Sequence, residues 1–184
     1  MKRLTAVFCL FICLLAFSSC NKTDNTEHFV SQLQSCPDEL RYMPELLSKY
    51  ESVEKIKISV LADNTVTYSL KDKITAKSGY EYQNINLHIK KHTNNLNASI
   101  ETIIDSYSAE KDSAVKAVKH EFDKRKYAVT YEIRPDLGYT VLNVIFPASE
   151  NISAYFTLQL VDIPDSIDGK ILDKICNDLE VIKI

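Results

Sequence analysis

Apolar and polar residues alternate over three stretches in the first half of the chain. The alternation covers residues 56–60, 66–70 and 85–90, and Asp63-Asn64 supplies a turn between the first two. Because successive side chains of a strand point to opposite faces, this pattern predicts antiparallel strands with one apolar and one solvated face.

The same period returns in the last third of the chain. Apolar residues alternate over residues 127–133, 142–146 and 154–160, and Pro135-Asp136-Leu137-Gly138 has its Pro and Gly suitably placed for a turn. These segments predict a three-stranded meander.

Other segments show helical spacing. Pro37 begins a stretch that Pro44 splits into two short helices ending near Tyr50. A long amphipathic stretch follows Asn97 and predicts either one helix of about 24 residues or two helices broken near Asp112-Ser113. Its apolar positions are Ile100, Ile103, Ile104, Tyr107, Val115, Val118 and Phe122.

The chain closes with a further amphipathic helix over residues 167–179. Asp165 or Ser166 is the expected N-terminal cap, and residues 181–184 form a short strand. We therefore expect an α+β fold, with an antiparallel sheet of about six strands packed with a central and a C-terminal helix.

The N-terminus has the three parts of a secretory signal peptide. Two cations precede an apolar run over residues 4–17 whose only polar member is Thr5, and the small pair Ser18-Ser19 follows. The run is too short to span a bilayer, which needs about 20 residues.

Cys20 directly after Ser18-Ser19 makes this segment resemble a bacterial lipoprotein signal. The resemblance implies cleavage before Cys20, acylation of its thiol, and attachment of the protein to a membrane of the cell envelope, on its periplasmic face or at the cell surface. Phe17 occupies the position where leucine is usual. The alternative is an ordinary secreted protein cut near residues 16–18.

The predicted organisation has three parts. Residues 1–19 are the signal peptide, residues 20–34 are a polar tether, and residues 35–184 are a single α+β domain. Removal of the signal lowers the cations from 22 to 20 against 25 acids, giving a net charge of −5. We expect no nucleic-acid partner, because a mildly acidic chain lacks the charge that phosphates attract.

No arrangement of residues predicts a catalytic, metal or cofactor site. Gly79, Gly138 and Gly169 are the only glycines, so no Gly-rich phosphate loop can be built. His88 and His92 are about 13 Å apart on one strand, too far to share a zinc ion.

Two residue pairs are candidates for other roles. Cys36 and Cys176 can form a disulfide in an oxidising compartment, or Cys176 is a buried small residue on the apolar face of its helix. Tyr80 and Tyr82 lie around Gly79, in an expected loop. Tyrosine favours interfaces, so they are candidates for a contact patch.

From residue 53 onward the chain resembles the PsbP-like (DcrB-type) α/β/α sandwich family. The resemblance rests on the order of the elements, on the closing segment Leu172-Asp173-Lys174-Ile175, and on Tyr155-Phe156-Thr157-Leu158 in the preceding strand. The chain lacks the Gly-Trp pair frequent in that family. The resemblance implies an accessory or binding role and transfers no catalytic residue.

The leading hypothesis is thus a lipid-anchored, non-catalytic envelope protein whose domain binds another protein. The second is an envelope protein that binds a small lipid or glycan, and the third is a hydrolase whose site is assembled from distant residues.

Overall fold

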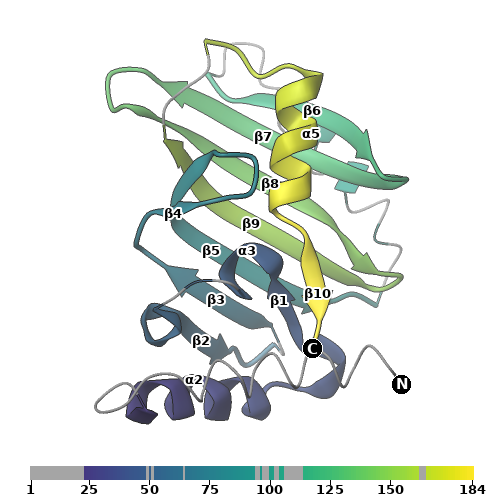
Figure 1. Cartoon of the computed structure of the whole chain (residues 1–184). Helices are drawn as coiled ribbons and strands as arrows, with labels where there is room; N and C mark the ends of the chain where they lie inside the picture. The colour runs from purple at the N-terminus through teal and green to yellow at the C-terminus, as the bar shows by residue number, and fades with distance from the viewer. Residues whose placement is uncertain are drawn as a thin grey trace.

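The structure is a computed structural model (Figure 1). It describes residues 23–48, 50, 52–63, 65–93, 96, 100–101, 104–105, 114–161 and 165–184. Within these residues no helix is both long and apolar enough to cross a membrane. The helical elements are α2 (Thr23–Ser35), η1 (Asp38–Leu40), α3 (Glu45–Ser48), η2 (Val53–Lys55) and α5 (Gly169–Asp178). The strands are β1 (Tyr42–Pro44), β2 (Lys57–Val60), β3 (Val66–Leu70), β4 (Ile74–Thr75), β5 (Glu81–Lys91), β6 (Lys116–Phe122), β7 (Arg125–Arg134), β8 (Tyr139–Ser149), β9 (Ile152–Val161) and β10 (Val181–Lys183).

Eight of the strands form one antiparallel sheet. Seven of them lie in the order β2-β3-β5-β9-β8-β7-β6, and β4 pairs with β5. β1 and β10 form a separate two-stranded sheet. The predicted α+β class, the β2–β3 hairpin and the β7–β8–β9 meander are confirmed, and the chain has more strands than the alternation predicted.

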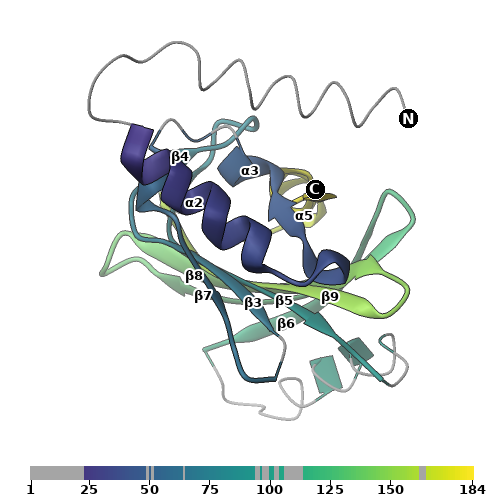
Figure 2. The ribbon, with the colours of Figure 1, turned by 90° about the horizontal axis from the view of Figure 1, so that it is seen from below.

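One face of the large sheet carries the hydrophobic core. A continuous row of apolar or aromatic side chains crosses it from edge to edge, each residue opposite the next in the register. The row consists of Ile58, Tyr68, Leu87, Phe156, Val144, Val129 and Val118. Helices α2, α3 and α5 lie on one side of the sheet (Figure 2) and bury apolar side chains in the core, including Phe29, Leu47 and Ile175.

The N-terminal helix α2 was not predicted from the sequence. Residues 20–34 were expected to form a polar tether, but α2 begins at Thr23, and its Phe29 and Leu33 are buried in the core. The segment is mostly polar, but Phe29 and Leu33 are four residues apart and therefore lie on one face of the helix. Their burial is enough to attach that face to the core. Most of the expected tether is therefore part of the folded body.

The two short helices predicted around Pro44 are present as η1 and α3, with a strand between them. β1 pairs antiparallel with β10, so the predicted terminal strand is confirmed and its partner lies near the N-terminal end of the domain. Two further backbone bonds, Glu45 N–H to Glu180 O at 2.8 Å and Ile184 N–H to Arg41 O at 2.9 Å, extend this pairing at both ends.

The predicted central helix is wrong in its second half. Residues 116–122 form β6 at an edge of the sheet, where Val118 and Phe122 pack against the core. Val118 and Phe122 are four residues apart, a spacing that places them on one face of a helix and also on one face of a strand. The segment forms a strand because it pairs with β7. Ile100 is helical as expected, and Leu96, before the predicted start, is helical as well. Residues 97–99, 102–103 and 106–113 lie outside the described residues.

Helix α5 is confirmed, but its cap is not the predicted one. Asp168 precedes the helix, and its Oδ1 accepts a hydrogen bond from the Ile171 N–H at 2.9 Å. Asp165 and Ser166 are both exposed and lie before the cap.

This geometry yields a stability prediction. Asp168→Ala should lower the free energy of unfolding by about 1 kcal/mol, because a helix N–H loses its acceptor. Asp165→Ala is the matched control and should change it by less than about 0.5 kcal/mol. Urea denaturation of the two variants measures both values, and equal losses would contradict the assigned cap.

Candidate functional site

The face of the sheet opposite the helices carries a row of uncharged polar side chains. We call this set the polar row; it crosses strands β3, β5, β9, β8 and β7 at successive register positions. Its members are Ser69, Asn86, Thr157, Asn143 and Thr130. Thr130 is buried and the other four are half-buried, so the row lies at the surface without protruding from it.

Asn143 organises the centre of the polar row. Its Oδ1 accepts hydrogen bonds from Thr157 Oγ1 at 3.1 Å and from the Tyr155 hydroxyl at 3.3 Å, while its Nδ2 donates to Thr130 Oγ1 at 3.1 Å. At the other end of the row, Ser69 Oγ donates to Asn86 Oδ1 at 2.8 Å. These bonds hold the amide side chains in fixed orientations.

A bulge in β5 places two more amides beside the row. The register between β5 and β9 shifts between Gln83 and Asn86, and Asn84 has a left-handed backbone with φ of 50°. Gln83 Nε2 and Asn84 Nδ2 both donate to Gln159 Oε1, at 3.0 and 2.8 Å. We call Gln83, Asn84 and Gln159 the amide cluster. Asn tolerates positive φ better than most residues, and bulges are common next to functional sites.

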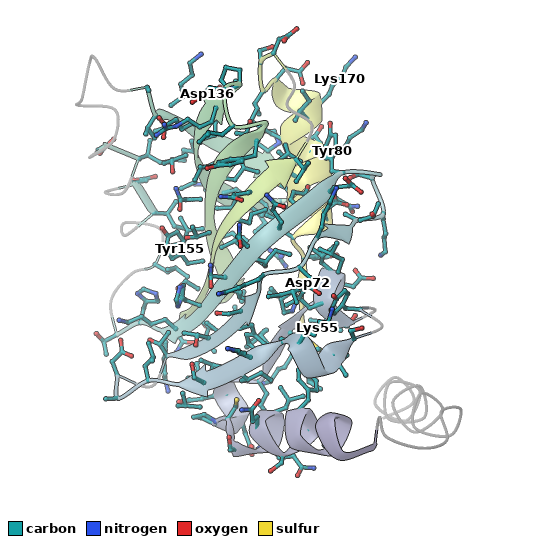
Figure 3. All side chains as sticks on the ribbon, turned by 90° about the vertical axis from the view of Figure 1, so that its left-hand side faces the viewer. Lys55, Asp72, Tyr80, Asp136, Tyr155 and Lys170 are labelled. Carbon is teal, nitrogen blue, oxygen red and sulfur yellow. The ribbon has the colours of Figure 1, made fainter. Side chains whose placement is uncertain are left out.

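An aromatic pair lies in the adjacent register position. His88 on β5 stacks on Tyr155 on β9, with ring centroids 6.0 Å apart. Burial lowers the pKa of His88 below its ordinary value of 6.5 and thus favours the neutral ring. Figure 3 shows Tyr155 on the side of the sheet away from α5.

Charged side chains border this face, and six of them form three ion pairs. The ion pairs at the border are Lys90–Asp63 at 2.8 Å, Lys119–Glu101 at 2.7 Å and Glu132–Arg134 at 2.8 Å. The Lys90 ammonium lowers the pKa of Asp63 to about 2, chiefly through their hydrogen bond. The centre of the face is therefore neutral.

Part of the same face is covered by the segment after β5. Leu96 and Ile100 form a small apolar cluster with Ala128 and Ile145. This cluster removes Ala128 and Ile145 from solvent, whereas Val141, opposite Gln159 in the register, is half-buried beside the amide cluster.

The predicted contact patch is wrong for Tyr82. Its side chain is fully buried, and its hydroxyl donates to Asp178 Oδ2 at 3.0 Å. Asp178 also accepts bonds from the backbone N–H and the hydroxyl of Ser78. Tyr80 is half-buried beside α5, with Lys174 Nζ 5.4 Å from its ring centroid (Figure 3). A tyrosine adjacent to a glycine suggested an exposed loop, but the Asp178 carboxyl provides Tyr82 with a buried partner.

The structure holds Cys36 and Cys176 as free, buried thiols and not as the predicted disulfide. Burial raises the pKa of the Cys176 thiol to about 12 and that of Cys36 above its ordinary value. Cys176 thus packs as a small apolar residue on α5, which was the alternative interpretation. Cys20 lies outside the described residues, so its acylation stays a prediction.

The histidines do not gather around a metal position. His92 Nε2 lies 2.7 Å from Ser153 Oγ, and His120 Nε2 lies 2.8 Å from Asp173 Oδ1. Within the described part of the chain, no group of three or more His, Cys, Asp or Glu side chains could hold a metal ion.

A hollow lies where the β6–β7 and β8–β9 turns meet. It has a volume of about 530 Å³, and its lining includes the cations Lys124, Arg125 and Lys126 together with the acids Asp123 and Glu150. Because the two acids offset most of this positive charge, we consider the polar face the stronger candidate.

Comparison with known protein families, curated proteins and solved structures gives no match to this chain. The resemblance to the PsbP-like family therefore stays a prediction.

The buried bond of Tyr82 yields a second stability prediction. Burial raises the pKa of the Tyr82 hydroxyl, which therefore keeps its proton and donates it to Asp178. Tyr82→Phe should lower the free energy of unfolding by about 1–2 kcal/mol, because the Asp178 carboxyl loses a donor. Tyr80→Phe is the control, with an expected change below about 0.5 kcal/mol. If Tyr80→Phe cost as much as Tyr82→Phe in chemical denaturation, the assigned bond would be wrong.

The histidines of β5 yield a pH prediction. Burial lowers the pKa of both His88 and His92, with Lys90 adding to the effect at His92. The unfolded chain, with a histidine pKa of about 6.5, therefore binds protons first. Stability from these residues is present above pH 6.5 and is lost as the pH falls through the lower folded pKa.

The urea midpoint should therefore fall between pH 7.5 and pH 5. The double variant His88→Gln with His92→Gln should show a smaller fall than the native chain, and His120→Gln serves as the control. An unchanged pH dependence in the double variant would contradict the prediction.

Proposed function

We propose that this protein is a lipid-anchored accessory module of the cell envelope, which acts by binding a partner through its polar face. The anchor is the acylated Cys20 that the signal sequence implies. The observation that carries the binding role is the polar row, a set of fixed, half-buried amides and hydroxyls on the face that α2, α3 and α5 leave uncovered.

The chemistry of the row supports binding over catalysis. Amide and hydroxyl side chains form directional hydrogen bonds but do not titrate near neutral pH. A catalytic role would need a positioned acid, base or nucleophile. The resemblance to the PsbP-like family supports the same accessory role.

The position of α2 supports action close to the membrane. Two residues, Asn21 and Lys22, lie between Cys20 and Thr23, where α2 begins, which makes three steps along the chain. Helix α2 is attached to the core through Phe29 and Leu33. An extended residue spans at most about 3.6 Å, so this spacer reaches roughly 10 Å. The domain would therefore meet its partner near the lipid surface.

Two exposed lysines allow a matched test of the binding face. Lys57 on β2 is opposite Ser69 in the register and so lies at the end of the polar row, whereas Lys170 lies on α5 (Figure 3). Each is replaced in turn by a diazirine amino acid, which inserts into C–H, O–H and N–H bonds and captures sugars as well as proteins. Irradiation of intact cells should give an adduct at position 57 and little at position 170.

The Cys20→Ser variant tests the anchor in the same experiment. Intact mass should show acyl chains on the native protein only, and the adduct at position 57 should be lost or strongly reduced in the variant. Equal adduct yields at positions 57 and 170 would overturn the binding face, and a native mass without acyl chains would overturn the anchor.

A further inference from the structure

The polar face is neutral where a ligand would lie. The polar row and the amide cluster contain no carboxylate, ammonium or guanidinium group. The border charges Lys90, Lys119 and Glu132 each hold an opposite charge within 3 Å, and the ammonium of Lys57 lies only at the end of the row, so the centre of the row has no charge to attract an ion. A charged ligand would lose its hydration without gaining a counter-charge.

The hydrogen-bonding groups of this face are of a mixed kind. Asn143 uses both lone pairs of its oxygen and one of its two N–H groups in the bonds given above. Gln159 accepts two hydrogen bonds through its Oε1, from Gln83 and Asn84. Neither bond uses the N–H donors of Gln159. The hydroxyls of the row offer further acceptor lone pairs. A partner that suits this set must both donate and accept at close intervals.

The extent of the row indicates an elongated ligand. Its five residues occupy five adjacent strands, and strands lie about 4.8 Å apart, so the row extends over roughly 19 Å. The amide cluster continues the polar surface along β5 and β9. An oligomer fits this length better than a single small molecule.

The composition of the face disfavours a protein partner and a lipid ligand. The centre of a protein–protein interface is depleted in charge but enriched in aromatic and apolar residues, and a lipid tail needs an apolar groove. Of the apolar residues on this face, Ala128 and Ile145 are already covered by Leu96 and Ile100, and Val141 is half-buried between Glu132 and Gln159 in the register.

We propose that the ligand of the polar row is a neutral glycan, an extended chain of uncharged sugars whose hydroxyls bond to Asn86, Asn143 and the amide cluster. Sugar hydroxyls both donate and accept, and they carry no charge. The half-buried ring of Tyr155 lies in the adjacent position, stacked on His88 and packed against the Leu96 and Ile100 cluster, and its exposed part can contact the apolar face of a sugar. This inference rests on the proposed function, since it names what the binding face holds.

The chemistry of the adduct at position 57 tests the inference. After complete proteolysis, the modified peptide is analysed by mass spectrometry. We expect mass increments of uncharged sugar residues, removed by mild acid hydrolysis. Peptides of another protein, or sugars bearing carboxylate, sulfate or phosphate, would overturn the glycan inference while leaving the binding face in place. Absence of any adduct above the Lys170 control would overturn the binding face itself.

Isosteric charged variants add a test in the same cells. Asn86→Asp and Gln159→Glu keep the size of each side chain but place a charge on the face, and each should reduce the adduct by about tenfold or more. Asn177→Asp, exposed on α5, is the matched control and should leave the yield unchanged. Melting temperatures of the purified variants identify any that fail to fold. Full adduct yield from both folded face variants would overturn the inference.

Discussion

The apolar row from Ile58 to Val118 fixes the register of the whole sheet. Each member lies opposite the next on seven successive strands, and all of them face the helical layer. A slip of one residue in any strand would move its apolar side chains to the other face. The same constraint aligns the polar row, because alternate residues of those strands must meet on the opposite face. The candidate site is thus a consequence of how the core packs.

Much of the sheet could be predicted because its strands have one buried and one solvated face. Alternation located β2, β3, β5 and the meander, since burial selects every second residue. It failed for residues 116–122, where Val118 and Phe122 satisfy a strand and a helix equally. It also failed for residues 23–35, where two buried apolar residues attach an otherwise polar helix. In both cases the secondary structure depends on the element that the segment packs against or pairs with. The local sequence pattern holds no information about that element.

The candidate site was only partly visible in the sequence. The polar members of residues 85–90 predicted a solvated face, but the meeting of Asn86, Thr157 and Asn143 depends on the register of strands far apart in the chain. The bulge at Asn84 has no sequence signal beyond an amide residue in a strand. Tyr82 was placed wrongly because its partner, Asp178, lies 96 residues away.

The pairing of β1 with β10 has a consequence for the order in which the chain can fold. β1 precedes the strands of the large sheet in the chain and β10 follows them, so the two-stranded sheet cannot form until β10 is available. In a chain that emerges from a ribosome N-terminus first, β1 stays unpaired until β10 has followed it. Contacts between distant segments also slow folding in general. Pairing of β1 with β10 is therefore expected to be a late step in folding.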